Sequence, residues 1–523
     1  MIIFLFLSLS SSKEIYAKVD GLNNSFCHLL APCDFINAAN QVTKGDYIHI
    51  SGTSIEKADD LDKIRVLFNV ALGKGAIVTS NNLTINGTNY RENGVSFIVI
   101  QSAAESRLHK FHFTGFKTSI MCFRKIDQGV ISMCTFSHNY VVGSIAMLMF
   151  GVGKCKLDEC YLAENTVTNT SLIAMFSTHL YLNMTIIERN FVKHESSQSL
   201  LYSINSVCEY TNTTIRNNAS PYAPLHQFEF RSCFGFWNCT WENNHHQELL
   251  LCDGTCEFNF SNNSIQYNQG TFISTSAGSV VTFNESDFRN NFSGEKAMFD
   301  IPGSKFIVYS TADFRSNTGR AFIDTRGLKS DIQIQKAKFS ENRFDESVIL
   351  TDSNSTIDIY QTTFSENMAN LGTIHANKSS VKIHHSQFNK NHGTSINVTD
   401  SVASIDANHF TNPLGPSITS NRGTINIISN FFRGKVMGGH LDINGKHRLY
   451  GLKFTASDSF ALSSKLRKDC FMCSYKERKD TIFSWAEIVG PKLLIIVLII
   501  FFYFLFQAKI HSYVRIFFSK KDL

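Results

Sequence analysis

Proline and charged residues are both scarce in this chain, and each shortage excludes a class of protein. Only 7 of the 523 residues are proline, and charged residues make up 18% of the total. A disordered chain would be rich in both and poor in Phe, whereas this sequence contains 45 Phe and 44 Asn. The composition also lacks the glycine period of collagen and the charge of a coiled coil. We therefore expect most of the chain to be folded.

Basic clusters are absent as well. The formal net charge is only +5, and no block of Lys and Arg of the kind that binds nucleic acid is present. We expect no nucleic-acid partner, no cofactor and no bound metal.

An aromatic or aliphatic residue followed three positions later by Asn recurs along most of the chain. The clear copies are Phe136/Asn139, Phe288/Asn291, Phe314/Asn317, Phe339/Asn342, Phe364/Asn367 and Phe388/Asn391. Weaker copies fill the gap: Leu162/Asn165, Ile187/Asn190, Ile215/Asn218, Trp241/Asn244 and Ile265/Asn268. Phe113 precedes the series, Phe410 and Phe432 follow it, and neighbouring members are 22 to 28 residues apart. A period of this length indicates a solenoid.

Each period is built from short strands. Val381 and Ile383 alternate with Lys382 and His384 before Phe388, and Asn- and Gly-rich turns separate such runs. The pattern predicts an all-β fold, a right-handed parallel β-helix (pectin-lyase-like solenoid) of about 13–14 coils and roughly 65 Å. We expect the Phe column to fill the interior and the Asn column to occupy a left-handed turn with stacked amides.

The two ends of such a rod need covers. Residues 34–41 predict a short helix that closes the N-terminal end, followed by an early strand at residues 47–50. We divide the chain into a signal peptide (1–12), an N-terminal cap with the first coils (13–100), the repeats (101–455), a Cys-containing juxtamembrane stalk (456–487), a transmembrane helix (488–508) and a short cytoplasmic tail (509–523).

Apolar segments at both termini predict the compartment. The run at residues 2–9, followed by three serines, is typical of a secretory signal peptide, although a buried strand is the alternative. Residues 488–508 are long enough to span a bilayer; a buried core helix and a GPI signal are the alternatives. We expect a single-pass membrane protein with its N-terminal part outside.

Fifteen Asn-x-Ser/Thr sequons accompany this arrangement, and we expect several to carry glycan in solvent-facing turns. The candidate glycosylation sites are Asn82, Asn86, Asn169, Asn183, Asn212, Asn218, Asn238, Asn259, Asn284, Asn291, Asn354, Asn377 and Asn397, with Asn23 and Asn262 completing the set.

The chain has 13 Cys, and in an oxidising compartment most of them should pair. The disulfide candidates are Cys27, Cys33, Cys134, Cys160, Cys470 and Cys473. Cys134 and Cys160 each lie two residues before the apolar residue of their repeat, so they should stack in adjacent coils within disulfide reach. For Cys470 and Cys473 a local disulfide is favoured over half a zinc site or a redox pair.

The Phe-x-x-Asn repeat resembles that of polymorphic-membrane-protein-like surface proteins in their single-span form. Relics of the companion glycine motif of that family stand at Gly319–Phe322, Gly372–Ile374 and Gly393–Ile396. The resemblance runs from Phe113 to Gly434 and implies a right-handed parallel β-helix that acts as a surface adhesin or in host interaction.

These observations predict a non-catalytic, glycosylated membrane protein that binds an extracellular protein or glycan at the cell surface. The alternatives are a β-helix carbohydrate-active enzyme, which would need a carboxylate trio in one column, and a resident of the secretory pathway. The second alternative depends on two candidate sorting signals, a dilysine signal at Lys520 and Lys521 and an internalisation signal at Tyr513. Plasma membrane is therefore expected first, and endoplasmic reticulum or Golgi second.

Overall fold

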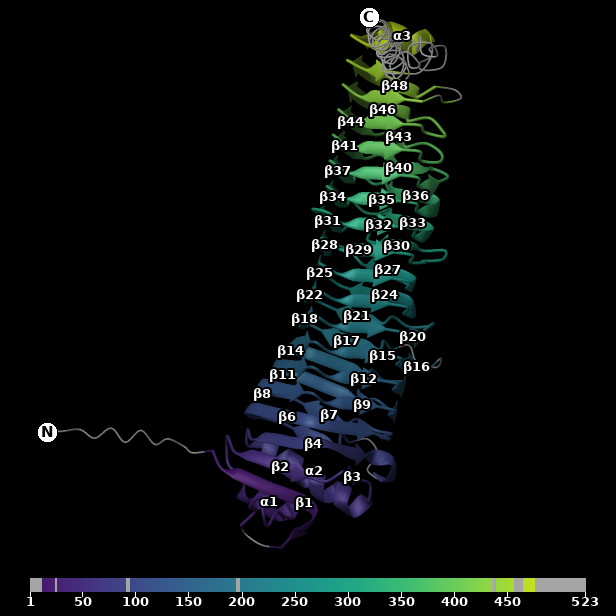
Figure 1. Cartoon of the computed structure of the whole chain (residues 1–523). Helices are drawn as coiled ribbons and strands as arrows, with labels where there is room; N and C mark the ends of the chain where they lie inside the picture. Colours follow the sequence, from purple (N-terminus) through teal and green to yellow (C-terminus); the bar gives the residue numbers. More distant parts are fainter. Residues whose placement is uncertain are drawn as a thin grey trace, which may run out of the picture.

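The computed structural model describes residues 12–23, 26–90, 95–193, 198–434, 436, 439–455 and 464–475. These residues form a rod, a right-handed parallel β-helix of about 15 turns (Figure 1). The predicted parallel β-helix is confirmed. The rod is slightly longer than expected because strands continue beyond the repeats at both ends.

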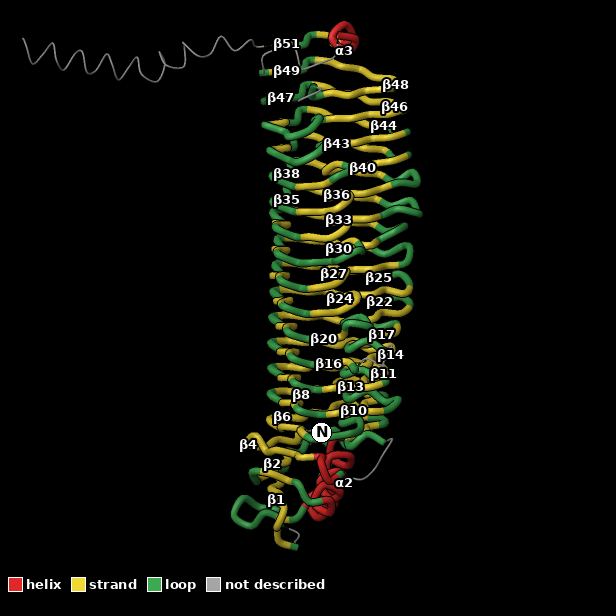
Figure 2. Tube along the Cα trace, turned by 90° about the vertical axis from the view of Figure 1, so that its right-hand side faces the viewer, coloured by secondary structure: helices red, strands yellow, loops and turns green. Residues whose placement is uncertain are grey.

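One parallel sheet, which we call sheet A, runs the whole length of the rod (Figures 1 and 2). Its strands, each hydrogen-bonded to the next, are β1 (Glu14–Leu22), β2 (Tyr47–Ser51), β4 (Ile77–Asn86), β6 (Ala103–Thr114), β8 (Ile126–Ser132), β11 (Leu148–Asp158), β14 (Ile173–Asn183), β18 (Val207–Thr211), β22 (Ser232–Trp237), β25 (Cys256–Ser261), β28 (Val280–Asn284), β31 (Lys305–Tyr309), β34 (Asp331–Gln335), β37 (Thr356–Tyr360), β41 (Ser380–His384), β44 (Val402–Asp406), β46 (Ile418–Ile428), β48 (Leu441–Tyr450) and β50 (Cys470–Phe471).

Sheet B carries the Phe column. It consists of β9 (Thr135–Ser137), β12 (Tyr161–Ala163), β15 (Ile186–Glu188), β19 (Thr214–Arg216), β23 (Thr240–Glu242), β26 (Ser264–Gln266), β29 (Asp287–Arg289), β32 (Asp313–Arg315), β35 (Lys338–Ser340), β38 (Thr363–Ser365), β42 (Gln387–Asn389), β45 (His409–Thr411), β47 (Phe431–Arg433), β49 (Lys453–Phe454) and β51 (Ser474–Tyr475), with β3 (Ser54–Ile55) paired to the end of β4.

Sheet C completes each coil and includes the first halves of β11, β14, β46 and β48. Its other strands are β5 (Ile98–Ile100), β7 (Met121–Phe123), β17 (Leu201–Ile204), β21 (His226–Glu229), β24 (His245–Asp253), β27 (Gln269–Thr275), β30 (Ala297–Asp300), β33 (Thr318–Asp324), β36 (Arg343–Thr351), β40 (Gly372–Asn377) and β43 (Ile396–Thr399). Short strands join it to sheet B in some coils: β10 (Tyr140–Val142), β13 (Thr166–Thr168), β16 (Phe191–Val192), β20 (Ala219–Ser220) and β39 (Met368–Ala369).

Helices close the N-terminal end of the rod (Figure 1). The predicted helix is confirmed as α1 (Phe35–Gln41), which begins where Asp34 accepts a hydrogen bond from the Asn37 amide. The longer helix α2 (Ala58–Gly73) was not predicted, although its buried apolar residues follow the helical period. A short 3-10 turn, η1 (Gly87–Asn89), follows, and α3 (Ser464–Asp469) lies near the last described strands.

The repeated Phe residues stack in the interior as predicted. The rings of Phe339, Phe364, Phe388, Phe410 and Phe432 follow one another at centroid distances of 5.0 Å and are nearly parallel. All five are at most 1% exposed. The spacing matches the strand separation, since equivalent residues of consecutive coils lie one above another. Phe454 extends this column beyond the predicted members.

The repeated Asn residues form a buried hydrogen-bonded ladder. Asn342 donates from Nδ2 to the Phe314 carbonyl at 2.9 Å and to Asn367 Oδ1 at 2.9 Å. Its own Oδ1 accepts from the Asn317 backbone N–H and side-chain amide, each at 3.0 Å. The same pattern links Asn139, Asn165, Asn190, Asn218, Asn244, Asn268, Asn291, Asn317, Asn342, Asn367 and Asn391.

The predicted left-handed conformation lies one residue earlier than expected. Glu341 and Lys390, immediately before ladder asparagines, have φ of 57° and 50°. The ladder Asn itself turns its amide inward to bond with neighbouring coils, so the exposed residue before it makes the tight turn. This corrects the assignment of the left-handed turn to the Asn column.

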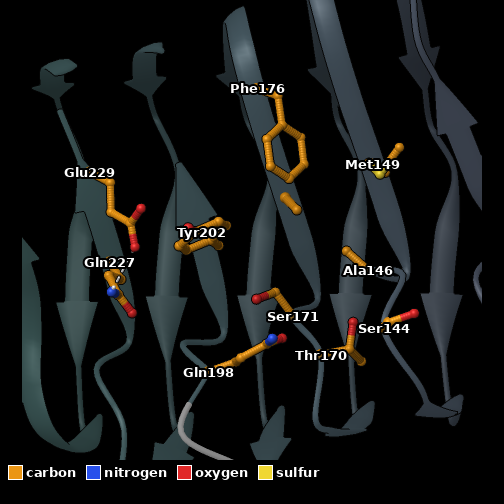
Figure 3. Close-up of a pocket in the computed structure, with 11 residues that line it drawn as sticks. Ser144, Ala146, Met149, Thr170, Ser171, Phe176, Gln198, Tyr202, Gln227 and Glu229 are labelled. Carbon is orange, nitrogen blue, oxygen red and sulfur yellow. Dashed lines mark hydrogen bonds between the residues drawn. The ribbon is translucent and has the colours of Figure 1, made fainter. Parts of the chain in front are cut away.

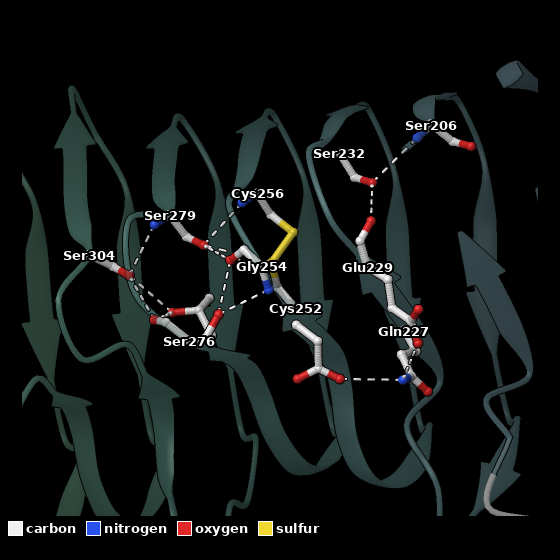
Figure 4. The surroundings of a disulfide bond; sticks show 12 residues. Ser206, Gln227, Glu229, Ser232, Cys252, Gly254, Cys256, Ser276, Ser279 and Ser304 are labelled. Atoms are coloured by element: carbon white, nitrogen blue, oxygen red, sulfur yellow. Dashed lines mark hydrogen bonds between the residues drawn. A yellow bond between two sulfur atoms is a disulfide. The ribbon is translucent and has the colours of Figure 1, made fainter. Parts of the chain in front are cut away.

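A second ladder, built from serine, was not predicted. It follows the corner between sheets C and A, where a backbone N–H of one coil donates to the hydroxyl of the next. Cys256 N donates to Ser279 Oγ at 3.1 Å, and Ser279 N donates to Ser304 Oγ at 3.3 Å (Figure 4). Such bonds satisfy backbone donors that the strand pairing leaves free at a corner.

Candidate functional site

The predicted membrane features cannot be placed on the fold. The candidate signal peptide, transmembrane segment and sorting residues Tyr513, Lys520 and Lys521 lie outside the described residues. Among the helices that are described, none is both long and apolar enough to cross a membrane.

Two of the candidate glycosylation sites lie inside the Asn ladder. Asn218 and Asn291 are at most 2% exposed, and the amide nitrogen of each already donates to a carbonyl and to the next Asn. A glycan on either nitrogen would break these bonds and would have no space, so we withdraw these two sites. The remaining candidates are exposed or half-buried: Asn23, Asn82, Asn86, Asn169, Asn183, Asn212, Asn238, Asn259, Asn262, Asn284, Asn354, Asn377 and Asn397.

The cysteines pair only partly as expected. Cys470–Cys473 is the predicted local disulfide, and the candidates Cys27 and Cys33 bond to each other. A third disulfide, Cys252–Cys256, was not predicted (Figure 4). The structure leaves seven thiols free, of which Cys233 alone is exposed.

The predicted Cys134–Cys160 bridge is wrong, although the predicted register is correct. The two residues precede the paired positions Thr135 and Tyr161 in adjacent coils. Each thiol instead faces a backbone carbonyl, Cys134 that of Ser132 at 3.3 Å and Cys160 that of Ile131 at 3.2 Å. Side chains stacked in a parallel ladder keep the strand spacing of about 4.8 Å, which exceeds the usual Cβ separation of about 3.8 Å in a disulfide.

A shallow pocket of about 320 Å³ opens on the outer face of sheet C (Figure 3). Met149, Ala174, Tyr202 and Gln227 occupy successive positions across β11, β14, β17 and β21. The methyl group of Ala174 is much smaller than the side chains on either side, which leaves the hollow. Polar side chains form its rim: Ser144, Thr170, Ser171 and Gln198.

Aromatic and polar groups converge in this pocket. The rings of Phe176 and Tyr202 meet edge to face at 6.2 Å. Gln227 Nε2 donates to Glu229 at 3.3 Å and to Asp253 at 3.4 Å. None of the described lining residues is basic. The pocket therefore offers an apolar wall beside hydrogen-bonding groups in a negative potential.

Burial and the neighbouring carboxylates keep the Tyr202 phenol protonated. Burial is the larger cause, and a hydrogen bond to Glu229 with the charges of Glu229 and Asp253 adds to it, so the pKa of Tyr202 rises to about 12. Tyr202 is thus a hydrogen-bond donor at neutral pH. It is not a general base.

A Ser–His pair lies directly beneath this face, inside the rod. Ser203 Oγ is 2.7 Å from His226 Nε2, and Tyr210 Oη is 3.1 Å from His226 Nδ1. The distances suit a nucleophile and a base, but both Ser203 and His226 are 0% exposed. Burial lowers the pKa of His226 well below its usual value. No substrate can reach the pair, so it is a structural hydrogen-bond chain.

Charged side chains gather farther along sheet C. Asp324 accepts from Arg320 Nη2 at 2.5 Å and from Arg326 Nη2 at 2.9 Å, and both arginines also contact Glu346. In the sequence, Asp324 and Arg326 are two residues apart, and their spacing gives no sign of the other two partners. Arg320 comes from the same strand and Glu346 from the next coil, so only the fold brings them together.

Asp300 stands next to Asp324 in the neighbouring coil. Burial and the Asp324 charge raise the pKa of Asp300. Among the described residues no hydrogen bond or ion pair to the Asp300 carboxylate is seen, and no group of His, Cys, Asp and Glu is arranged to hold a metal. A carboxyl with a raised pKa is able to act as a proton donor. Asp324, the neighbouring carboxylate, differs from it because it is held in ion pairs with two arginines.

Comparison with known proteins gives no family for this chain. No family model matches the chain, and no curated protein matches it. Among solved structures it is similar to the A-module of the Azotobacter vinelandii mannuronan C-5 epimerase AlgE6, with 9% identity, 82% of this chain and 97% of that chain covered, and a TM-score of 0.22. A mutant of the PL6 family alginate lyase AlyGC gives 8% identity, coverages of 80% and 91%, and a TM-score of 0.17. These distant neighbours are carbohydrate-active β-helix proteins.

Proposed function

We propose that this chain is a non-catalytic glycan-binding rod that acts in adhesion at the cell surface. The observation that carries the proposal is the pocket on sheet C, where the rings of Phe176 and Tyr202 lie beside Gln227, Glu229 and a rim of hydroxyls. Binding pockets are typically apolar with a few convergent polar groups that fix orientation. A solenoid also presents such a face repeatedly along its length.

The chemistry of the pocket matches that of a sugar ring. A pyranose has an apolar C–H face, which packs on aromatic rings, and hydroxyls at its edge, which exchange hydrogen bonds with amides and carboxylates. Tyr202 donates, Glu229 accepts, and Gln227 does both. Glu229 lines the pocket, Asp253 lies beyond it within hydrogen-bonding distance of Gln227, and no lining residue is basic. We therefore propose a neutral glycan rather than a uronate or a sulfated one.

Membrane attachment and surface display belong to the same proposal. Their support is the apolar segment at 488–508, the candidate signal peptide and the sequons. Surface biotinylation of cells that express the full chain tests this part, with the Lys520→Ser/Lys521→Ser variant alongside. Labelling of the unaltered chain supports adhesion. Labelling of the tail variant only would indicate residence in the secretory pathway.

The binding part of the proposal is tested with a glycan array probed by the full-length chain in detergent. Neutral oligosaccharides should be retained, and Tyr202→Ala should weaken their binding roughly tenfold by removing a ring and a donor. Tyr267→Ala is the matched control, since Tyr267 is an exposed tyrosine on the turn after β26. Equal binding by the Tyr202→Ala variant and the unaltered chain would contradict the proposal.

A carbohydrate-active enzyme is the second candidate, and Asp300 is the observation that favours it. Its raised pKa suits a general acid, and such an enzyme would cleave a glycan that lies along sheet C. Release of reducing ends from neutral or acidic polysaccharides by the full chain, lost in Asp300→Asn, would establish this function. No release from either class would leave the binding proposal in place.

A further inference from the structure

A flat indole on the outer face of sheet A forms a second candidate binding surface. Trp237 is the last residue of β22 and is 39% exposed. A Cβ atom on Gly235 would lie 1.8 Å from Cη2 of the Trp237 ring. The ring therefore lies over the bare backbone of Gly235, with one face against the sheet and the other toward solvent. Only glycine leaves room for this arrangement.

Polar side chains flank the indole on both sides. Glu209 and Asn259 are the register partners of Gly235 in the preceding and following coils, so each lies about 4.8 Å along the rod. Glu209 Oε1 is held 2.8 Å from His179 Nε2. The Asn259 amide is 3.3 Å from Glu257 Oε1. Both flanking side chains are half-buried, which limits their freedom and orders them beside the ring.

We propose that Trp237, Glu209 and Asn259 form a platform that binds one ring of a neutral glycan. The C–H face of the sugar packs on the indole, Glu209 accepts from its hydroxyls, and the Asn259 amide exchanges hydrogen bonds with them. This inference rests on the proposed glycan-binding function and adds a second subsite on another sheet. Because Glu209 and Glu257 are both acidic, the platform disfavours uronic acids.

Isothermal titration of the purified full-length chain in detergent with N-acetylchitohexaose and cellohexaose tests the platform. Trp237→Ala should weaken binding of the better ligand roughly tenfold. Gly235→Ala should do the same although it keeps the tryptophan, because the new methyl group lifts the ring off the sheet. Thr282→Ala is the matched control, since Thr282 lies in the same column two coils away and should leave binding unchanged.

The outcomes separate this inference from the proposed function. Loss of binding in Tyr202→Ala but not in Trp237→Ala or Gly235→Ala would overturn the platform and leave the pocket. Binding of a hexaguluronate as tightly as the neutral hexasaccharides, or more tightly, would also overturn the platform. A glycan found on Asn259 by peptide mapping would cover the indole and overturn it as well. Loss of glycan binding in both Trp237→Ala and Gly235→Ala, with unchanged thermal midpoints of unfolding, supports the platform.

Discussion

Removal of one amide from the buried Asn ladder should open the rod locally. The side chain of Asn342 takes part in four hydrogen bonds: two that it donates, to Phe314 O and Asn367 Oδ1, and two that it accepts from Asn317. At about 1 kcal/mol net for each bond, Asn342→Ala should lower the free energy of local opening by roughly 4 kcal/mol. Since about 1.4 kcal/mol corresponds to a factor of ten, hydrogen exchange of the backbone amides in these coils should accelerate by a factor of about 10³.

Hydrogen exchange followed by mass spectrometry is the appropriate assay, because coils of a solenoid open independently and a global midpoint averages over them. Peptides that contain Asn317 and Phe314 should show the acceleration, and peptides from β1 or β2 should not. Asn389→Ala is the control, since Asn389 lies on the outer face and its side-chain amide has no hydrogen-bond partner among the described residues. If both variants exchange alike, the ladder does not stabilise the rod and the reasoning is refuted.

Three further predictions concern the core and the thiols. Phe364→Ala removes a ring that stacks at 5.0 Å on both of its neighbours. The substitution should lower the free energy of unfolding, measured by chemical denaturation, by about 3–5 kcal/mol, whereas Phe364→Leu should lower it by less than about 1.5 kcal/mol. Burial lowers the pKa of His226, so below pH about 6.5 this residue binds a proton in the unfolded chain but not in the native one. His226 alone should then lower the free energy of unfolding by about 1.4 kcal/mol for each pH unit below that value, and His226→Gln should make the slope shallower by the same amount. An unchanged slope in the variant would contradict this. A thiol reagent should label one cysteine, Cys233, in the native chain and seven after unfolding; rapid native labelling of several would contradict the buried assignment.

The repeats made the fold predictable because a solenoid converts sequence spacing directly into spatial position. Phe388 and Phe410 are 22 residues apart in the chain and about one strand spacing apart in space, so local periodicity encodes a long-range contact. The same logic placed Cys134 next to Cys160 correctly. It could not tell whether the two sulfurs bond, because register specifies the column and not the direction in which each thiol turns.

The candidate sites were much less predictable. Tyr202 and Gln227 lie in strands with no shared motif, and the hollow between Met149 and Tyr202 exists because Ala174 is small. Periodicity shows that these residues face outward, but it carries no signal that a particular outward column forms a pocket. The helix α2 was not predicted for a different reason: its buried residues follow a 3.6-residue period and lie before the first repeat, so the repeat contains no information about it.

The class of fold, the column of aromatic residues and the stacked Asn amides can all be predicted from the sequence, since each follows from a short pattern repeated at one period. Which polar groups become neighbours is set by the three-dimensional packing of the coils. Asp324 acquired its two arginines and Glu346, two sequons proved to be buried, and the Trp237 ring came to lie over Gly235. These outcomes depend on how side chains of adjacent coils pack and orient, which a one-dimensional period does not specify.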